Sequence, residues 1–116
     1  MVNPVVYGKL VQVAKARQTI TFRELGQVAD MLLDSSDDTK MLGLVLDHIA
    51  DQEVREGRPL LPVLVVNESN NMPGAGLFKY AKRRKLQKGD DLTFFASELK
   101  RVHDYWGRTE PAPEHK

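Results

Sequence analysis

The strongest chemical signal in the chain is a basic segment over residues 79–88, in which six of the ten side chains are lysine or arginine. Such cations neutralise phosphates, and each neutralised phosphate releases counterions and adds affinity that falls with salt. The segment therefore predicts contacts with a nucleic acid. Lys40, in the third predicted helix, is the residue expected to contact the groove of the nucleic acid. The expected phosphate contacts are Lys79, Lys82, Arg83, Arg84 and Lys85.

Other residue types that carry chemistry are scattered along the chain. It has no cysteine, which excludes disulfides, thiolate metal ligands and a cysteine nucleophile. His48, His103 and His115 are far apart in the sequence. Its carboxylate pairs stand at spacings that exposed helix faces produce routinely. We therefore expect no catalytic residue, no metal site and no cofactor, and a protein that is not an enzyme.

Length and composition are those of one globular domain. The chain has 116 residues, of which 41% are hydrophobic and 28% are charged. No apolar run approaches the roughly 18 residues of a membrane span, and the first residues lack the pattern of a secretory signal. We expect a single domain over residues 1–107, a flexible tail over residues 108–116, no membrane partner and a cytoplasmic location.

The net charge of +1 conceals four zones of alternating sign. Residues 1–33 carry four basic and two acidic side chains, residues 34–58 carry three and seven, residues 59–88 six and one, and residues 89–116 four and six. A nucleic acid would be attracted by the third zone and repelled by the second. The grouping of charge in space separates two hypotheses: basic residues gathered on one face favour a nucleic acid, and interleaved acids favour a protein partner.

Capping residues and apolar spacing predict the helices that must position these charges. Asn3 before Pro4 is typical of a helix start. Thr21 and Glu24 form a capping box for a second helix. The expected elements are a helix to about Arg17, a short strand at 19–21, helices over 22–33 and 38–57, strands over 62–66 and 76–80 joined by a turn at 67–73, and a last helix from 90 or 91 to 107.

Residues 62–80 read as a β-hairpin, because an apolar β-branched run is followed by a polar turn and a glycine-rich return. Whether the segment 77–88 is strand or helix stays open. With the hairpin, the order is helix, short strand, helix, helix, hairpin, helix. This order predicts an α+β, winged-helix-like single domain in which the hairpin is the wing.

Three short motifs follow one another in a recognisable order: TFREL at Thr21–Leu25, KMLG at Lys40–Gly43 and PVLVV at Pro62–Val66. They resemble motifs in the winged-helix domain of the DNA alkylguanine alkyltransferases and the alkyltransferase-like proteins. The resemblance implies a winged-helix fold that binds DNA in preference to RNA, and double-stranded DNA in preference to single strands. The pattern RPLL, LVV and PGAG is also similar to that of small bacterial or mobile-element proteins of no settled role.

The chain departs from that family at the residues that carry its chemistry. The family's strand has an acceptor cysteine and an activating histidine, where this chain has Val63 and Leu64. Phe22 replaces the tyrosine that helps to turn a nucleotide out of the duplex, and Lys40 replaces an intercalating arginine. The resemblance therefore implies contact with DNA without alkyl transfer.

Other hypotheses stay open beside nucleic-acid binding. The basic segment could be a solvated surface that balances the acidic third helix. A protein-interaction or accessory, immunity-like module would use that helix's acidic face, or form a homodimer through the hairpin edge. An enzyme would need a pocket in which His48 or His103 meets a carboxylate. In every case the spacing predicts a core that contains Phe22, Leu25, Val45, Ile49, Leu64, Val66, Phe95 and Leu99.

Overall fold

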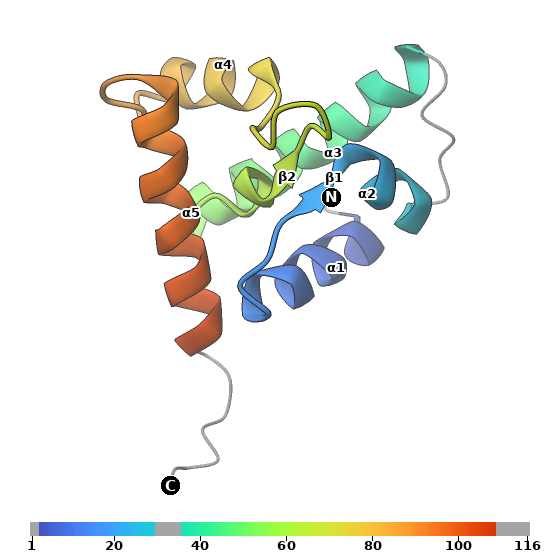
Figure 1. Cartoon of the computed structure of the whole chain (residues 1–116), viewed down its shortest axis with the longest axis horizontal. Coiled ribbons are helices and arrows are strands. Elements are labelled where there is room, and N and C mark those ends of the chain that lie inside the picture. The colour runs from blue at the N-terminus through green and yellow to red at the C-terminus, as the bar shows by residue number, and fades with distance from the viewer. Residues whose placement is uncertain (1–2, 30–35, 109–116) are drawn as a thin grey trace, which may run out of the picture.

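The computed structural model describes residues 3–29 and 36–108, and helices make up most of this part (Figure 1). The two short strands lie side by side near the middle of the molecule, with the helices around them. The elements are α1 (Pro4–Lys15), β1 (Ile20–Thr21), α2 (Phe22–Val28), α3 (Ser36–Arg55), the 3₁₀ helix η1 (Leu61–Leu64), β2 (Val65–Val66), α4 (Ala75–Arg83) and α5 (Asp91–Arg108).

The caps predicted for the first two helices are confirmed. The Asn3 carboxamide oxygen accepts hydrogen bonds from the backbone N–H groups of Val5 and Val6, at 3.0 and 3.2 Å. Thr21 and Glu24 form the reciprocal capping box, in which each side chain accepts from the other residue's backbone N–H at 3.1 Å. Local side chains therefore determine where α1 and α2 begin.

Several other helix boundaries differ from the prediction. α1 ends two residues before Arg17, which has a φ of 56° and so leaves the helical region. α3 begins and ends two residues earlier than expected, and Gly57, with a φ of 73°, stands just after it as the predicted stop. α2 ends at Val28, with Ala29 as its C-cap, before the predicted end at Leu33, and residues 30–33 lie outside the described residues. α5 includes Arg108, the first residue of the predicted tail, and the rest of that tail lies outside the described residues.

The winged-helix prediction is wrong, because the described residues contain no β-hairpin. The strand predicted at 62–66 is a 3₁₀ turn followed by a two-residue strand. That strand, β2, pairs in parallel with β1, so that Ile20 is opposite Val65 and Thr21 is opposite Val66. The domain is therefore mainly helical, with a minimal parallel sheet that joins distant segments of the chain.

The predicted return strand at 76–80 lies inside α4. Ala, Leu, Lys and Arg dominate this helix, and all four are strong helix formers. The buried side chains are Phe78, Tyr80 and Ala81, and burial at the successive positions 80 and 81 fits a helix face and not the alternation of a strand. Gly74 is the N-cap, so the glycine-rich motif begins a helix and does not close a hairpin.

The core forms where α1, α3 and α5 meet the buried segment Leu60–Val66 (Figure 1). Half of the predicted core positions are fully buried, and the other half pack against the core while keeping partial exposure to solvent. The buried ones are Leu25, Ile49, Leu64 and Val66. The half-buried ones are Phe22, Val45, Phe95 and Leu99.

Two buried glutamates hold the chain where it enters the buried segment. Glu53, on α3, is 0% exposed, and its carboxylate accepts hydrogen bonds from the Arg58 guanidinium at 2.7 to 3.2 Å and from the Tyr7 hydroxyl at 3.2 Å. Glu98, on α5, accepts a hydrogen bond from the backbone N–H of Leu60 at 2.8 Å. Both contacts tie the start of the segment to a helix.

Replacing Arg58 with methionine (R58M) should strongly destabilise the protein, because the Glu53 carboxylate would stay buried without its counter-charge. Removing one partner of a buried ion pair costs roughly 3 to 5 kcal/mol. We expect the free energy of unfolding, measured by circular dichroism in urea, to fall by about 3 kcal/mol. The double variant E53M/R58M removes both charges and should be more stable than R58M. Wild-type stability in R58M would contradict this role for the pair.

Candidate functional site

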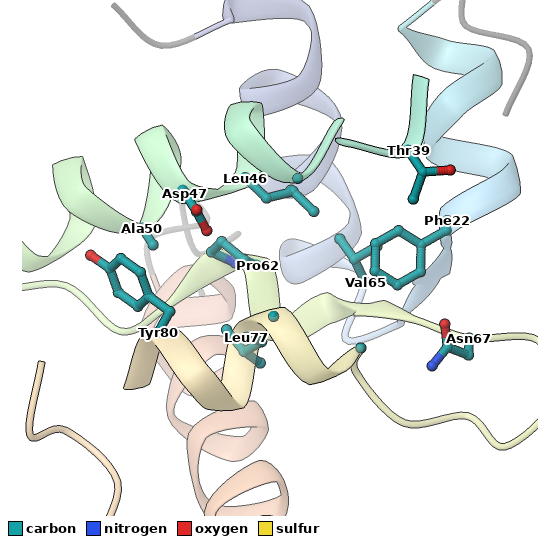
Figure 2. A pocket seen from close by; sticks show the side chains of 13 residues that line it. Phe22, Thr39, Leu46, Asp47, Ala50, Pro62, Val65, Asn67, Leu77 and Tyr80 are labelled. Carbon is teal, nitrogen blue, oxygen red and sulfur yellow. The ribbon is translucent and has the colours of Figure 1, made fainter. Parts of the chain in front are cut away.

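A groove with a volume of about 320 Å³ lies between α3 and α4 (Figure 2). Pro62 and Val65, from the buried segment, form its floor, and Phe22 and Tyr80 stand toward its two ends. We call it the α3–α4 groove. Most of its lining is apolar, with Phe22, Thr39, Gly43, Leu46, Asp47, Ala50, Pro62, Val65, Asn67, Gly74, Gly76, Leu77 and Tyr80 around it.

The wall on α3 is one face of a regular helix. Thr39, Gly43, Leu46 and Ala50 follow one another at spacings of three and four, so their side chains share that face. Two of the four are glycine and alanine, which leave the helix backbone close to the surface of the groove. An added Cβ at Gly43 would have no atom within 4 Å. The glycine therefore leaves open space and does not make a tight contact.

The wall on α4 also contains a glycine that leaves open space. Gly76, Leu77 and Tyr80 line it, again at helical spacing. An added Cβ at Gly76 would also have no atom within 4 Å, whereas one at Gly74 would touch the Phe22 ring at 3.5 Å. Each helical wall therefore contributes one glycine that leaves space in the groove.

One carboxylate, that of Asp47, lies in the groove. Figure 2 shows it between the two helices, directed toward Pro62. Burial raises the pKa of Asp47 above the usual value of a carboxyl, while the positive charge of Arg83 opposes the rise and the negative charge of Asp51 adds to it. No side chain in the described ranges donates a hydrogen bond to Asp47. The carboxylate can therefore accept one from an occupant of the groove.

A polar network closes the end of the groove at Tyr80. The Tyr80 hydroxyl donates a hydrogen bond to Asp51, and Arg84 donates both to Asp51 Oδ1 at 2.8 Å and to the Tyr80 hydroxyl oxygen at 3.2 Å. The hydrogen bond from Tyr80 is the largest cause that lowers the pKa of Asp51. Burial and the bond to Asp51 raise the pKa of Tyr80. This network ties α4 to α3.

The structure divides the predicted phosphate contacts into paired and unpaired cations. Arg84 is paired with Asp51 in the network at Tyr80. Lys82 Nζ lies 3.4 Å from Asp91 Oδ1, at the start of α5. Both cations are still partly exposed, but an acid already neutralises each of them. The basic segment is therefore less positive in space than it is in sequence.

The same pattern holds for two arginines outside the basic segment. Arg17 pairs with Asp104 at 3.0 Å, and Arg23 pairs with Glu68 at 3.1 Å. Acids are thus interleaved with bases on several parts of the described surface. By the criterion set from the sequence, this arrangement favours a protein partner over a nucleic acid.

Three predicted contacts in the basic segment keep a free charge. Lys79, Arg83 and Lys85 are exposed and form no ion pair within residues 3–29 and 36–108. Lys79 and Arg83 are four residues apart on α4, at the edge of the groove wall, and the Arg83 guanidinium lies 5.4 Å from the centroid of the Tyr80 ring. Lys40 is also exposed and unpaired in the described part of the chain, on the solvent side of α3.

Sequence reasoning missed the groove itself. Its walls come from segments that are far apart in the chain, such as Phe22, Leu46 and Leu77. A usable signal was present in the small residues Gly43 and Ala50 beside apolar positions of one helix. Neither His48 nor His103, the histidines singled out for an enzyme, lines the groove.

Comparisons with models of protein families, with curated proteins and with solved structures gave no match. The described residues include no group of three or more histidine or acidic side chains that is placed to hold a metal ion. None of the helices in this part of the chain combines the length and apolar composition needed to cross a membrane. The fold and the site together define a small helical domain with an apolar surface groove.

Replacing Gly43 with alanine should stabilise the protein, because glycine inside a helix is less favourable than alanine by about 0.5 to 1 kcal/mol. No atom lies within 4 Å of the added Cβ, so the gain should not be offset by a clash. Urea unfolding measures the change. Gly8→Ala, in α1 and equally free of neighbours, is the matched control. A loss of stability in Gly43→Ala alone would show that the groove does not have this free space.

Proposed function

We propose that the protein is a non-enzymatic interaction module, and that the α3–α4 groove receives an apolar segment of a partner protein. The observation that carries this proposal is the groove, with apolar helical walls, a buried floor and an open side. Concave apolar surfaces of this kind are characteristic of binding sites for ligands and partners. Its volume of about 320 Å³ suits a few apolar side chains.

The arrangement of charge supports a protein partner. A nucleic acid needs a track of cations that no acid neutralises. Here Lys82 and Arg84 are paired with Asp91 and Asp51, and a further carboxylate, Asp47, lies in the groove. A surface that mixes both signs around an apolar centre is the usual composition of a protein interface.

The lining of the groove supports binding over catalysis. Asp47 and Tyr80 are the titratable side chains in it, and the Tyr80 hydroxyl already donates its hydrogen bond to Asp51. A nucleophile within hydrogen-bond reach of a general base is not among the lining residues. The absence of cysteine from the chain supports a reducing, cytoplasmic setting for the interaction.

Filling the groove should weaken partner binding without unfolding the protein. Gly43→Leu places a side chain in the open space, whereas Gly8→Leu makes the same change on the exposed side of α1. We would select binders from a random peptide library on the wild-type protein and measure their affinities by fluorescence anisotropy. We expect Gly43→Leu to weaken the selected peptides at least tenfold, because it occupies the space of a buried anchor. Gly8→Leu should bind as the wild type does.

Circular dichroism of both variants shows whether the fold is kept. Peptides that bind Gly43→Leu as tightly as the wild type, in a variant that is folded, would rule out the groove as the docking site. A library that yields no binder to the wild type would count against the whole proposal.

Nucleic-acid binding is a second candidate function, which the unpaired cations Lys79, Arg83 and Lys85 favour. It does not need the wing, because these side chains are presented by α4 and the turn after it. DNA is the expected form, with Lys40 as a further contact. The preferences for DNA over RNA and for a duplex rested on the resemblance to a winged-helix domain and have no support from the helical fold.

The triple variant Lys79→Ala, Arg83→Ala and Lys85→Ala tests this second function. Binding to labelled single-stranded and duplex DNA is measured from about 50 to about 200 mM salt. If the three cations contact phosphates, the slope of log K against log salt should become less steep by about 2 to 3. Lys9→Ala, Arg55→Ala and Lys100→Ala together remove the same charge elsewhere and should leave the slope unchanged. No binding by the wild type at low salt would exclude this function.

A further inference from the structure

We propose that the occupant of the α3–α4 groove is an amphipathic helix of a partner protein, with acidic residues along the flank that faces α4. This inference rests on the proposed function and adds the chemistry and orientation of the partner. It is carried by three features of the groove: the absence of a free backbone edge in its helical walls, the unpaired cations on its α4 side, and the carboxylate on its α3 side.

The walls determine the backbone form of the occupant. Both are α-helices, whose interior backbone groups are bonded within the helix, and the N–H groups of the first turn of α4 are too few to form the row of partners that a strand needs. An extended peptide would therefore find no row of backbone partners along either wall, as it would on a sheet edge. A helix satisfies its own backbone groups and needs only side-chain contacts. Apolar anchors at spacings of three and four would fill the space beside Gly43 and Gly76.

The cations on the α4 side of the groove determine the sign of the charge that the partner helix should carry on the flank facing α4. Arg83 follows Tyr80 by three residues and Gly76 by seven, so it lies on the same side of the helix as these lining residues. Lys79 lies four residues before Arg83, further toward solvent. Both are exposed and unpaired within the described residues, so an acidic side chain next to the apolar stripe could reach them.

The α3 side of the groove carries the opposite charge near the same end. Asp47 lines the groove there, and no described side chain donates a hydrogen bond to it. Asp51, one turn later, is already neutralised by Arg84. The groove is therefore negative on one side and positive on the other. A partner helix with an acidic flank toward α4 and a basic or hydrogen-bond-donating residue toward Asp47 complements both sides.

The experiment combines charge reversal in the protein with charge exchange in the peptide. The probes are library peptides whose binding to the wild type is lost in Gly43→Leu. We expect these peptides to have apolar residues at spacings of three and four with Glu or Asp on one flank. The variant Lys79→Glu/Arg83→Glu should weaken them at least tenfold, since two attractions become repulsions. Replacing the peptide's acids with lysine should restore its binding to this variant.

Lys9→Glu/Lys100→Glu reverses two charges on α1 and α5 that do not line the groove; it is the charge-matched control and should bind as the wild type does. If Gly43-dependent peptides bind Lys79→Glu/Arg83→Glu as they bind the wild type, the proposed acidic flank is wrong, while the docking function of the groove still stands. Selected peptides that depend on Gly43 but are basic on the flank toward α4 would also overturn the acidic flank. A labelled oligonucleotide that binds the wild type and is lost in Gly43→Leu would assign the groove to a nucleic acid and overturn the inference.

Discussion

The segment Leu60–Val66 passes through the centre of the molecule, and two buried carboxylates hold the point where it enters. Glu53 neutralises Arg58 just before the segment, and Glu98 accepts the hydrogen bond of the Leu60 backbone N–H. Buried charges and polar groups are tolerated only when they are paired, so these contacts restrict the chain to one path between α3 and η1. That path brings the segment beneath both α3 and α4. The floor of the groove therefore depends on the Glu53–Arg58 ion pair, which lies outside the groove.

The parts of the fold that depend on neighbours in sequence could be predicted, and those that depend on distant contacts could not. Asn3 and the Thr21–Glu24 pair act within three residues of themselves, and both caps were predicted correctly. The pairing of β1 with β2 joins segments more than forty residues apart, and nothing local distinguishes it from a hairpin. The glycine-rich approach to α4 was read as a turn because glycine is common both in turns and beside helix starts.

The candidate site shows the same limit for charge. All five predicted phosphate contacts in the basic segment lie at the surface, as the sequence indicated. What the sequence could not give is that two of them, Lys82 and Arg84, meet an acid from another helix: Asp91 belongs to α5 and Asp51 to α3. Packing these helices against α4 turns a run of like charges into a mixed surface. A count of basic residues along the chain therefore overstates the positive field that a partner would encounter.

The glycines of the groove separate what folding requires from what binding would use. A glycine inside a helix weakens that helix, and the fold usually gains in return a close contact or a backbone angle that other residues avoid. Gly43 has neither, because its φ is not positive and no atom lies near the position of a Cβ. Its effect on the molecule is empty space beside the apolar side chain of Leu46. The groove therefore contains space that the fold does not require, and its apolar lining is exposed to water at a cost in free energy. These two properties are the physical argument for an occupant.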